Sequence, residues 1–142
     1  MQHSYRQLIS EHEQIEECAN ALLADVADAS VPASDLAAQL GELALVVKRH
    51  IAVEDEVVGT LDPATLSQPW TDAWVEGEAA FKRLKSDWMA FLVRWDGIAI
   101  AEDRSGFVSA AQAILGRLRD RLAIETRAFY ATALQTGSIA LR

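Results

Sequence analysis

The sequence predicts an all-α protein, an antiparallel up-down-up-down bundle of four helices. Apolar residues recur at spacings of three and four along four long segments, which is the period of a helix with one buried face. Breaker residues, such as those at Val31–Ala33, separate these segments. No run of alternating apolar and polar residues is long enough to predict a strand.

The composition indicates one folded domain spanning residues 1–142. A hydrophobic share of 51% argues against disorder. The net charge of −8 repels phosphate backbones and anionic lipid, so we predict neither a nucleic-acid nor a membrane partner. The single cysteine, Cys18, allows no internal disulfide, and the start of the sequence lacks the pattern of a signal peptide. We therefore predict a cytoplasmic protein.

The first predicted helix spans about residues 4–29, where Ser4 and Gln7 resemble a capping box. Its inward stripe consists of Tyr5, Leu8, His12, Ile15, Ala19, Leu22 and Val26. The second helix is expected from Ser34–Asp35, a suitable N-cap, to about Gly59. Its inward stripe consists of Leu36, Leu40, Leu43, Val47, His50, Glu54 and Val57.

The third predicted helix spans about residues 71–95, after a short turn capped at Asp62–Pro63. An aromatic residue recurs at every seventh position, which is typical of an inward seam. The seam consists of Trp74, Phe81, Trp88 and Trp95, with Gly77, Leu84 and Phe91 between them. Residues 96–106 are expected to form a connector before the fourth helix, over about residues 107–134. Its stripe consists of Phe107, Ala111, Ile114, Leu118, Arg121 or Leu122, Glu125, Phe129 and Ala133.

Ionisable residues interrupt these apolar stripes at one level of the predicted bundle. They are His12 in the first helix, His50 and Glu54 in the second, and Arg121 and Glu125 in the fourth. Taken singly, an inward histidine or glutamate is more often an ordinary core or helix-end residue. Their shared level favours a site, because buried carboxylates need a cation, and two imidazoles with two carboxylates suit a transition metal.

These motifs resemble those of the hemerythrin-like, or HHE cation-binding, domain family. Residues 50–57, HIAVEDEV, resemble the family's second-helix HxxxE[DE] motif, and Ser10-Glu11-His12 resembles its first-helix E-H element. Residues 121–125, RLAIE, resemble its fourth-helix HxxxE motif with arginine in place of histidine. The resemblance implies a four-helix bundle around a non-haem di-iron centre. One iron would take histidines from helices one, two and four, the other would take histidines from helix three, and two carboxylates would bridge them.

Carried over residue by residue, the resemblance implies the metal ligands His12, His50, Glu54 and Glu125 in a degenerate site. Arg121 stands where the family has its fourth-helix histidine, and no histidine follows His50. At the level of the site the third helix offers Trp74, Glu78, Phe81 and Lys82. The second iron therefore lacks nitrogen ligands, which speaks against reversible oxygen binding and against a di-iron oxidase.

Two states of the site are left open by the sequence. In the first, the four ligands hold one iron or another divalent metal, and the protein is a non-enzymatic metal-binding or sensory protein for iron, oxygen or nitric oxide. In the second, no metal is bound, Arg121 bridges Glu54 and Glu125, and Lys82 assists if it turns inward. The protein is then an adaptor or structural bundle with a protein partner or a second copy of itself. In both states, the acidic runs beside His12 and Glu54 are expected to be mostly solvated.

Overall fold

Helices account for the regular structure of the described chain, in which no strand occurs. The computed structural model describes the backbone of residues 5–60 and 68–136, and the side chains of residues 6–54, 77 and 79–127. The helices are α1 (Tyr5–Val26), α2 (Ala33–Thr60), α3 (Gln68–Arg94), α4 (Gly97–Glu102) and α5 (Arg104–Thr136). The all-α prediction is confirmed.

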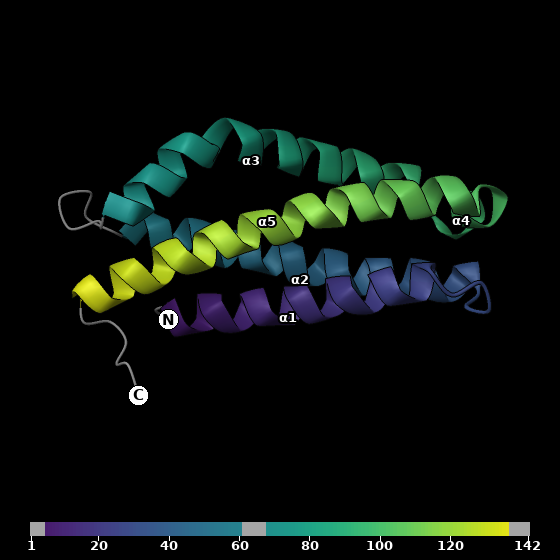
Figure 1. Cartoon of the computed structure of the whole chain (residues 1–142), viewed down its shortest axis with the longest axis horizontal. Coiled ribbons are helices and arrows are strands. Elements are labelled where there is room, and N and C mark those ends of the chain that lie inside the picture. The colour runs from purple at the N-terminus through teal and green to yellow at the C-terminus, as the bar shows by residue number, and fades with distance from the viewer. Residues whose placement is uncertain (1–4, 61–67, 137–142) are drawn as a thin grey trace.

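The four long helices lie lengthwise beside one another, and successive long helices run in opposite directions (Figure 1). Helix α1 packs against α2 and α5, while α3 packs mainly against α5. The short α4 lies at one end and contacts both α2 and α5. In the described chain, no helix has the length and apolarity that a membrane span requires.

Residues 96–106 were expected to be a connector, and this prediction is wrong. The Asp96 carboxylate accepts a hydrogen bond from the Ala99 backbone N–H at 2.8 Å, an N-cap that starts α4. Ile100 is fully buried and fixes α4 to the core. Asp103 accepts a hydrogen bond from the Gly106 N–H at 3.1 Å, so α5 begins three residues earlier than predicted. Two aspartate caps therefore replace the expected loop.

Two other helices also begin earlier than predicted. Helix α2 begins at Ala33, one residue before the expected cap, and the Pro32 carbonyl accepts a hydrogen bond from the Leu36 N–H at 3.2 Å. Helix α3 begins at Gln68 and carries Pro69 in its first turn, where proline removes no helical hydrogen bond. Three predicted features lie outside the described residues, namely the cap at Ser4, the turn at Asp62–Pro63 and the end of the last helix near Gly137.

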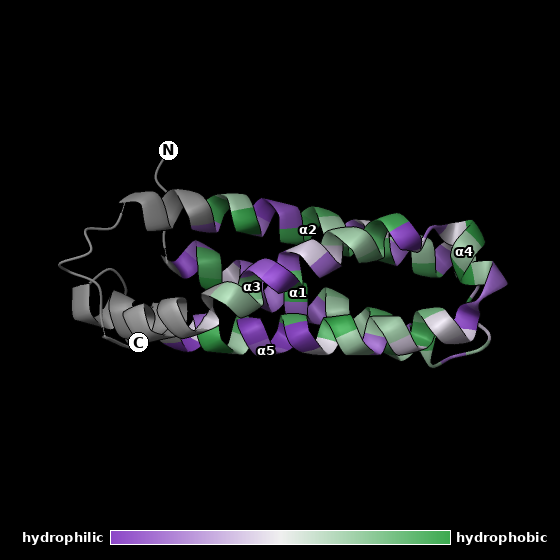
Figure 2. Ribbon diagram, turned by 90° about the horizontal axis from the view of Figure 1, so that it is seen from above, coloured by the Kyte–Doolittle hydropathy of each residue, from purple (hydrophilic) through white to green (hydrophobic). Residues whose placement is uncertain are grey.

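The predicted stripes are buried wherever their side chains are described, except at Gly77 and Phe81, which are partly buried. Hydrophobic and hydrophilic residues accordingly alternate around the long helices (Figure 2). The aromatic seam is buried at Trp88, Phe91 and Trp95, and it meets Phe107 of α5. The ring centroids of Trp95 and Phe107 are 5.5 Å apart, and those of Phe91 and Phe107 are 5.9 Å apart. This apolar half of the core fixes the helices whose other ends carry the polar cluster. The stripe members Tyr5, Val57, Trp74, Phe129 and Ala133 have side chains outside the described set.

Candidate metal centre

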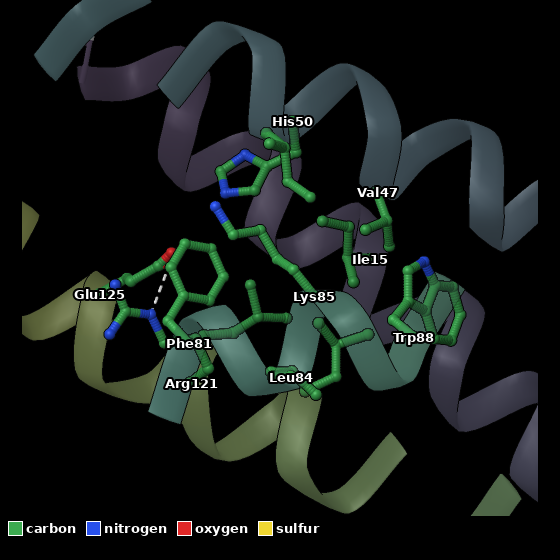
Figure 3. A pocket seen from close by; sticks show the side chains of 12 residues that line it. Ile15, Val47, His50, Phe81, Leu84, Lys85, Trp88, Arg121 and Glu125 are labelled. Carbon is green, nitrogen blue, oxygen red and sulfur yellow. Dashed lines mark ion pairs between the residues drawn. The ribbon is translucent and has the colours of Figure 1, made fainter. Parts of the chain in front are cut away.

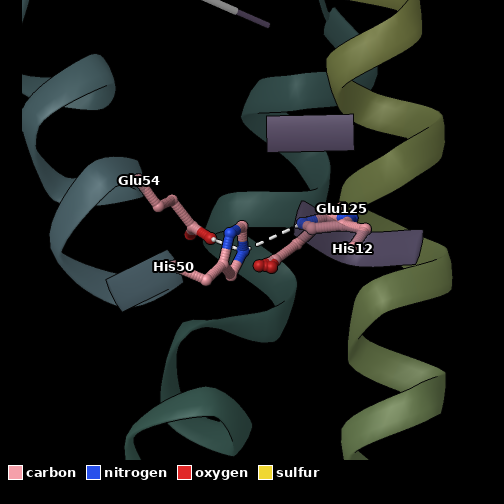
Figure 4. A group of neighbouring side chains, drawn as sticks. All are labelled: His12, His50, Glu54 and Glu125. Atoms are coloured by element: carbon pink, nitrogen blue, oxygen red, sulfur yellow. Dashed lines mark hydrogen bonds and ion pairs between the residues drawn. The ribbon is translucent and has the colours of Figure 1, made fainter. Parts of the chain in front are cut away.

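Four buried side chains from three helices converge in the interior (Figure 4). His12 comes from the first half of α1, His50 and Glu54 come from the later part of α2, and Glu125 comes from the later part of α5. One donor atom from each residue lies within 4.8 Å of the other three, and none of the four residues is more than 5% exposed. These are the four residues that the sequence predicts as ligands, and together they could hold a metal ion.

Helix geometry accounts for the contacts inside the cluster. His50 and Glu54 are four residues apart, so their side chains stack on one face of α2, with His50 Nε2 at 3.1 Å from Glu54 Oε2. His12 faces them from α1, and its Nε2 atom lies 2.9 Å from His50 Nε2. The two imidazole rings meet edge to face with centroids 4.5 Å apart. Both Nε2 atoms therefore point into the same small space.

The outer nitrogen of each imidazole is held by a further polar side chain. His12 Nδ1 lies 2.8 Å from Thr126 Oγ1, and His50 Nδ1 lies 3.1 Å from Glu11 Oε1. Metal-binding histidines are usually oriented by such contacts at the nitrogen that does not bind the metal. Glu11 is only 8% exposed, so the prediction that its acidic run is solvated is wrong at this residue. Its position four residues before the buried Ile15 places it at the edge of the inward face, but this spacing does not identify His50 as its partner.

These outer contacts set the chemistry of the inner atoms. When each Nδ1–H donates outward, both Nε2 atoms present lone pairs toward the two carboxylates. Four acceptor atoms cannot share one buried space unless protons or a cation lie between them. The donor set therefore fits a metal ion, and protons must serve when no metal is bound.

The histidine pKa values show where one of these protons lies. Burial, and to a smaller extent the neighbouring His50 charge, lower the pKa of His12 to about 3, so His12 is neutral. Burial opposes a charge on His50 as well, but hydrogen bonds and charges from Glu54 and Glu11 raise the pKa of His50 above its ordinary value. We therefore assign the proton to His50 Nε2, which faces both His12 Nε2 and Glu54.

A second proton lies between the two carboxyl groups. Burial and the Glu54 charge raise the pKa of Glu125 well above its ordinary value. Burial also acts to raise the pKa of Glu54, but hydrogen bonds from His50 and Glu125 outweigh it and lower that pKa. Glu125 is thus the neutral acid that donates to the ionised Glu54. Two protons hold the cluster together, which is the same positive charge that one divalent ion would supply.

Arg121 borders the cluster. Its Nε atom lies 3.6 Å from Glu125 Oε2, and its guanidinium carbon lies 4.2 Å from the centroid of the Phe81 ring. Its Nη1 atom reaches the backbone of α3 at Gly77, where an added Cβ atom would collide with it. The guanidinium therefore extends from Glu125 toward α3.

The other predicted lining residues divide into two groups. Phe81 is half-buried and stacks on Arg121 as described, whereas Lys82 is exposed and does not turn inward. Helical period explains the difference, because the positions that follow Phe81 on the same face are Leu84, which is buried, and Lys85, whose Nζ lies 4.6 Å from the Phe81 centroid. The side chains of Trp74 and Glu78 lie outside the described set.

A small cavity adjoins the cluster. It has a volume of about 30 Å³ and is lined by His50, Phe81, Lys85, Glu125 and mainly apolar neighbours (Figure 3). This volume is enough for a water or another very small molecule. The cluster therefore has space beside it for a small molecule.

Comparison of the chain with protein-family models, with curated proteins and with solved structures gave no match. Fold and site together describe an all-helical protein with a buried cluster of two histidines and two glutamates that could hold a metal ion.

Proposed function

We propose that this protein is a hemerythrin-like, antiparallel up-down-up-down four-helix bundle that binds one divalent metal ion through His12, His50, Glu54 and Glu125. It acts as a non-enzymatic metal-binding or sensory protein with a degenerate form of the family's site. The observation that carries the proposal is the convergence of four buried acceptor atoms within 4.8 Å. A cytoplasmic location fits the single cysteine but stays a prediction from the sequence.

The donor set supports iron, with zinc and manganese as the other candidates, because imidazole and carboxylate together suit these ions. Two nitrogens about 2.1 Å from one ion are about 3.0 Å apart at a right angle, close to the observed 2.9 Å. Four protein ligands leave open positions on a six-coordinate iron. The adjoining cavity would let oxygen or nitric oxide reach such a position.

Elemental analysis of protein purified without a tag or chelator tests this proposal. The expected result is close to one iron, zinc or manganese per chain, with the metal lost in His50→Ala. Arg49→Ala, an exposed neighbour on the same helix, is the matched control and should keep the metal. Metal-free wild-type protein that also fails to bind added metal, or equal metal in both variants, would contradict the proposal.

A second candidate is a metal-free adaptor, favoured by one observation: the buried Arg121 forms an ion pair with the buried Glu125. In this version Arg121 neutralises Glu54 and Glu125, and the acidic exterior serves a protein partner or a second copy of the chain. Arg121→Ala would then lower the melting temperature strongly, because it leaves buried acids without their cation. The exposed Arg117→Ala is the control, and equal melting temperatures would exclude the adaptor version. Under the metal-binding proposal, Arg121→His should instead increase iron affinity.

A further inference from the structure

A groove between α3 and α5 gathers positive charge on an otherwise acidic protein. It has a volume of about 300 Å³, and its described lining includes Arg83, Arg117 and Arg121 against one acidic residue, Asp120. The chain as a whole has 21 acidic and 13 basic residues. Three guanidinium groups around one concave surface are therefore a local reversal of the protein's charge, which is the arrangement expected for an anion site.

The inner wall of this groove is a fixed guanidinium. Arg121 is 7% exposed, stacks on Phe81, and reaches the α3 backbone at Gly77, where only hydrogen leaves room for Nη1. A planar, fixed guanidinium offers paired donors that match the two oxygens of a carboxylate or phosphate. Gly77 thus leaves the space that the Arg121 guanidinium occupies at the inner wall of the groove.

The rim of the groove carries two exposed arginine side chains, one of them in a weak ion pair. Arg117 pairs with Asp87 at 2.8 Å, but the two side chains are 45% and 56% exposed. An exposed pair of this kind contributes little stability, so an entering anion can replace Asp87 at small cost. Arg83 is also exposed and lines the same groove. Rim and inner wall together place guanidinium groups from two helices around the groove.

We propose that this groove binds a small oxyanion, a carboxylate or a phosphate, between Arg83, Arg117 and Arg121, and that its binding strengthens metal binding. Arg121 connects the two sites, because the same guanidinium lies 3.6 Å from Glu125. The charge of Arg121 repels a metal ion, and an oxyanion on the groove side offsets this charge. The oxyanion also competes with Glu125 for the Arg121 guanidinium. The regulatory half of this inference rests on the proposed metal site, whereas the anion site does not.

Titration calorimetry on the metal-free protein tests the anion site, with inorganic phosphate, succinate and chloride compared at constant ionic strength. Phosphate or succinate should bind and chloride should not. The stronger of the two identifies the class of oxyanion. Arg117→Gln should weaken binding at least about ten-fold, because a charged donor is lost. Arg119→Gln is the matched control, since Arg119 is exposed on the same helix but lines a different groove. Absence of binding, or equal losses in both variants, would overturn the anion site.

Metal titration against a competing chelator, with and without the better oxyanion, tests the coupling. The oxyanion should tighten metal binding roughly five-fold or more, a typical allosteric coupling, and this effect should vanish in Arg117→Gln. Unchanged metal affinity in the presence of a bound oxyanion would overturn the coupling. Oxyanion binding by a protein that binds no metal would instead contradict the proposed function and leave the groove assignment intact.

Discussion

Binding of a divalent metal is expected to release two protons. In the metal-free protein one proton lies on His50 Nε2, and the other lies on Glu125, where it bonds to Glu54. Both atoms must lose their protons before they can bind a metal. At pH values below the raised pKa values of both groups, the apparent affinity should therefore rise about 100-fold per pH unit, or about 2.7 kcal/mol.

The contribution of Glu125 to the stability of the metal-free protein falls as pH rises, whereas the metal affinity increases. The pKa of this carboxyl is raised in the folded state, so its stabilising contribution is present below the unfolded value of 4.5 and is lost as pH rises through the folded value. Raising the pH thus weakens the metal-free fold at Glu125 while it strengthens metal binding. Titration calorimetry in two buffers of different protonation enthalpy counts the released protons directly. A competing chelator gives the affinity over the same pH range.

Glu125→Gln is the discriminating variant for this prediction. The neutral amide keeps the shape of the protonated acid, so we expect the unfolding free energy of the metal-free protein to change by no more than about 1 kcal/mol. Metal binding should weaken and release one proton in place of two. Release of no proton by wild type would refute the assigned protons, and an unchanged count in the variant would exclude Glu125 as a ligand.

Three further perturbations test neighbouring parts of the site. Gly77→Ala puts a Cβ atom against Arg121 Nη1, whereas the Cβ atom of the control variant Gly116→Ala meets open space. In urea unfolding, Gly77→Ala should therefore be less stable than Gly116→Ala by at least about 1 kcal/mol. Equal stabilities would show that the guanidinium moves freely. Thr126→Val removes the partner of His12 Nδ1 and should weaken metal binding about ten-fold, as measured by chelator competition. An unchanged metal affinity would show that this contact is dispensable. His12 has its pKa lowered to about 3, so its stabilising contribution is present above 6.5 and falls by about 1.4 kcal/mol per pH unit as pH drops toward 3. His12→Gln lacks this slope, and parallel unfolding curves for the variant and wild type would refute the assignment.

The four converging residues could be predicted because helix geometry fixes both face and height. The apolar spacing identifies the inward face of each helix, and the alternating direction of successive helices sets which positions share a level. His12, His50, Glu54 and Glu125 each occupy an apolar stripe at compatible heights, so their approach follows from the pattern.

Residues at the edge of a stripe could not be assigned in the same way. Glu11 and Lys85 lie beside the inward face, where a long polar side chain can turn toward the core or toward solvent. Their orientation depends on particular partners, His50 Nδ1 for Glu11 and the Phe81 ring for Lys85, which spacing does not identify. The short helix α4 was missed for a different reason, since one hydrogen bond at Asp96 decides whether six residues form a helix.

The protonation of the carboxyl pair bears on the role of Arg121. A guanidinium that replaced a metal would keep both carboxylates ionised, yet the pKa of Glu125 is raised by burial and by Glu54 even though Arg121 acts to lower it. The 3.6 Å separation between Arg121 Nε and Glu125 Oε2 is also longer than the roughly 2.8 Å of a close charged hydrogen bond. The cluster therefore still needs two protons to balance its charge despite the presence of Arg121. A divalent ion can displace these protons, whereas it cannot displace a guanidinium that is covalently part of the chain. This charge balance favours the metal-binding version of the site and leaves Arg121 to connect it with the groove between α3 and α5.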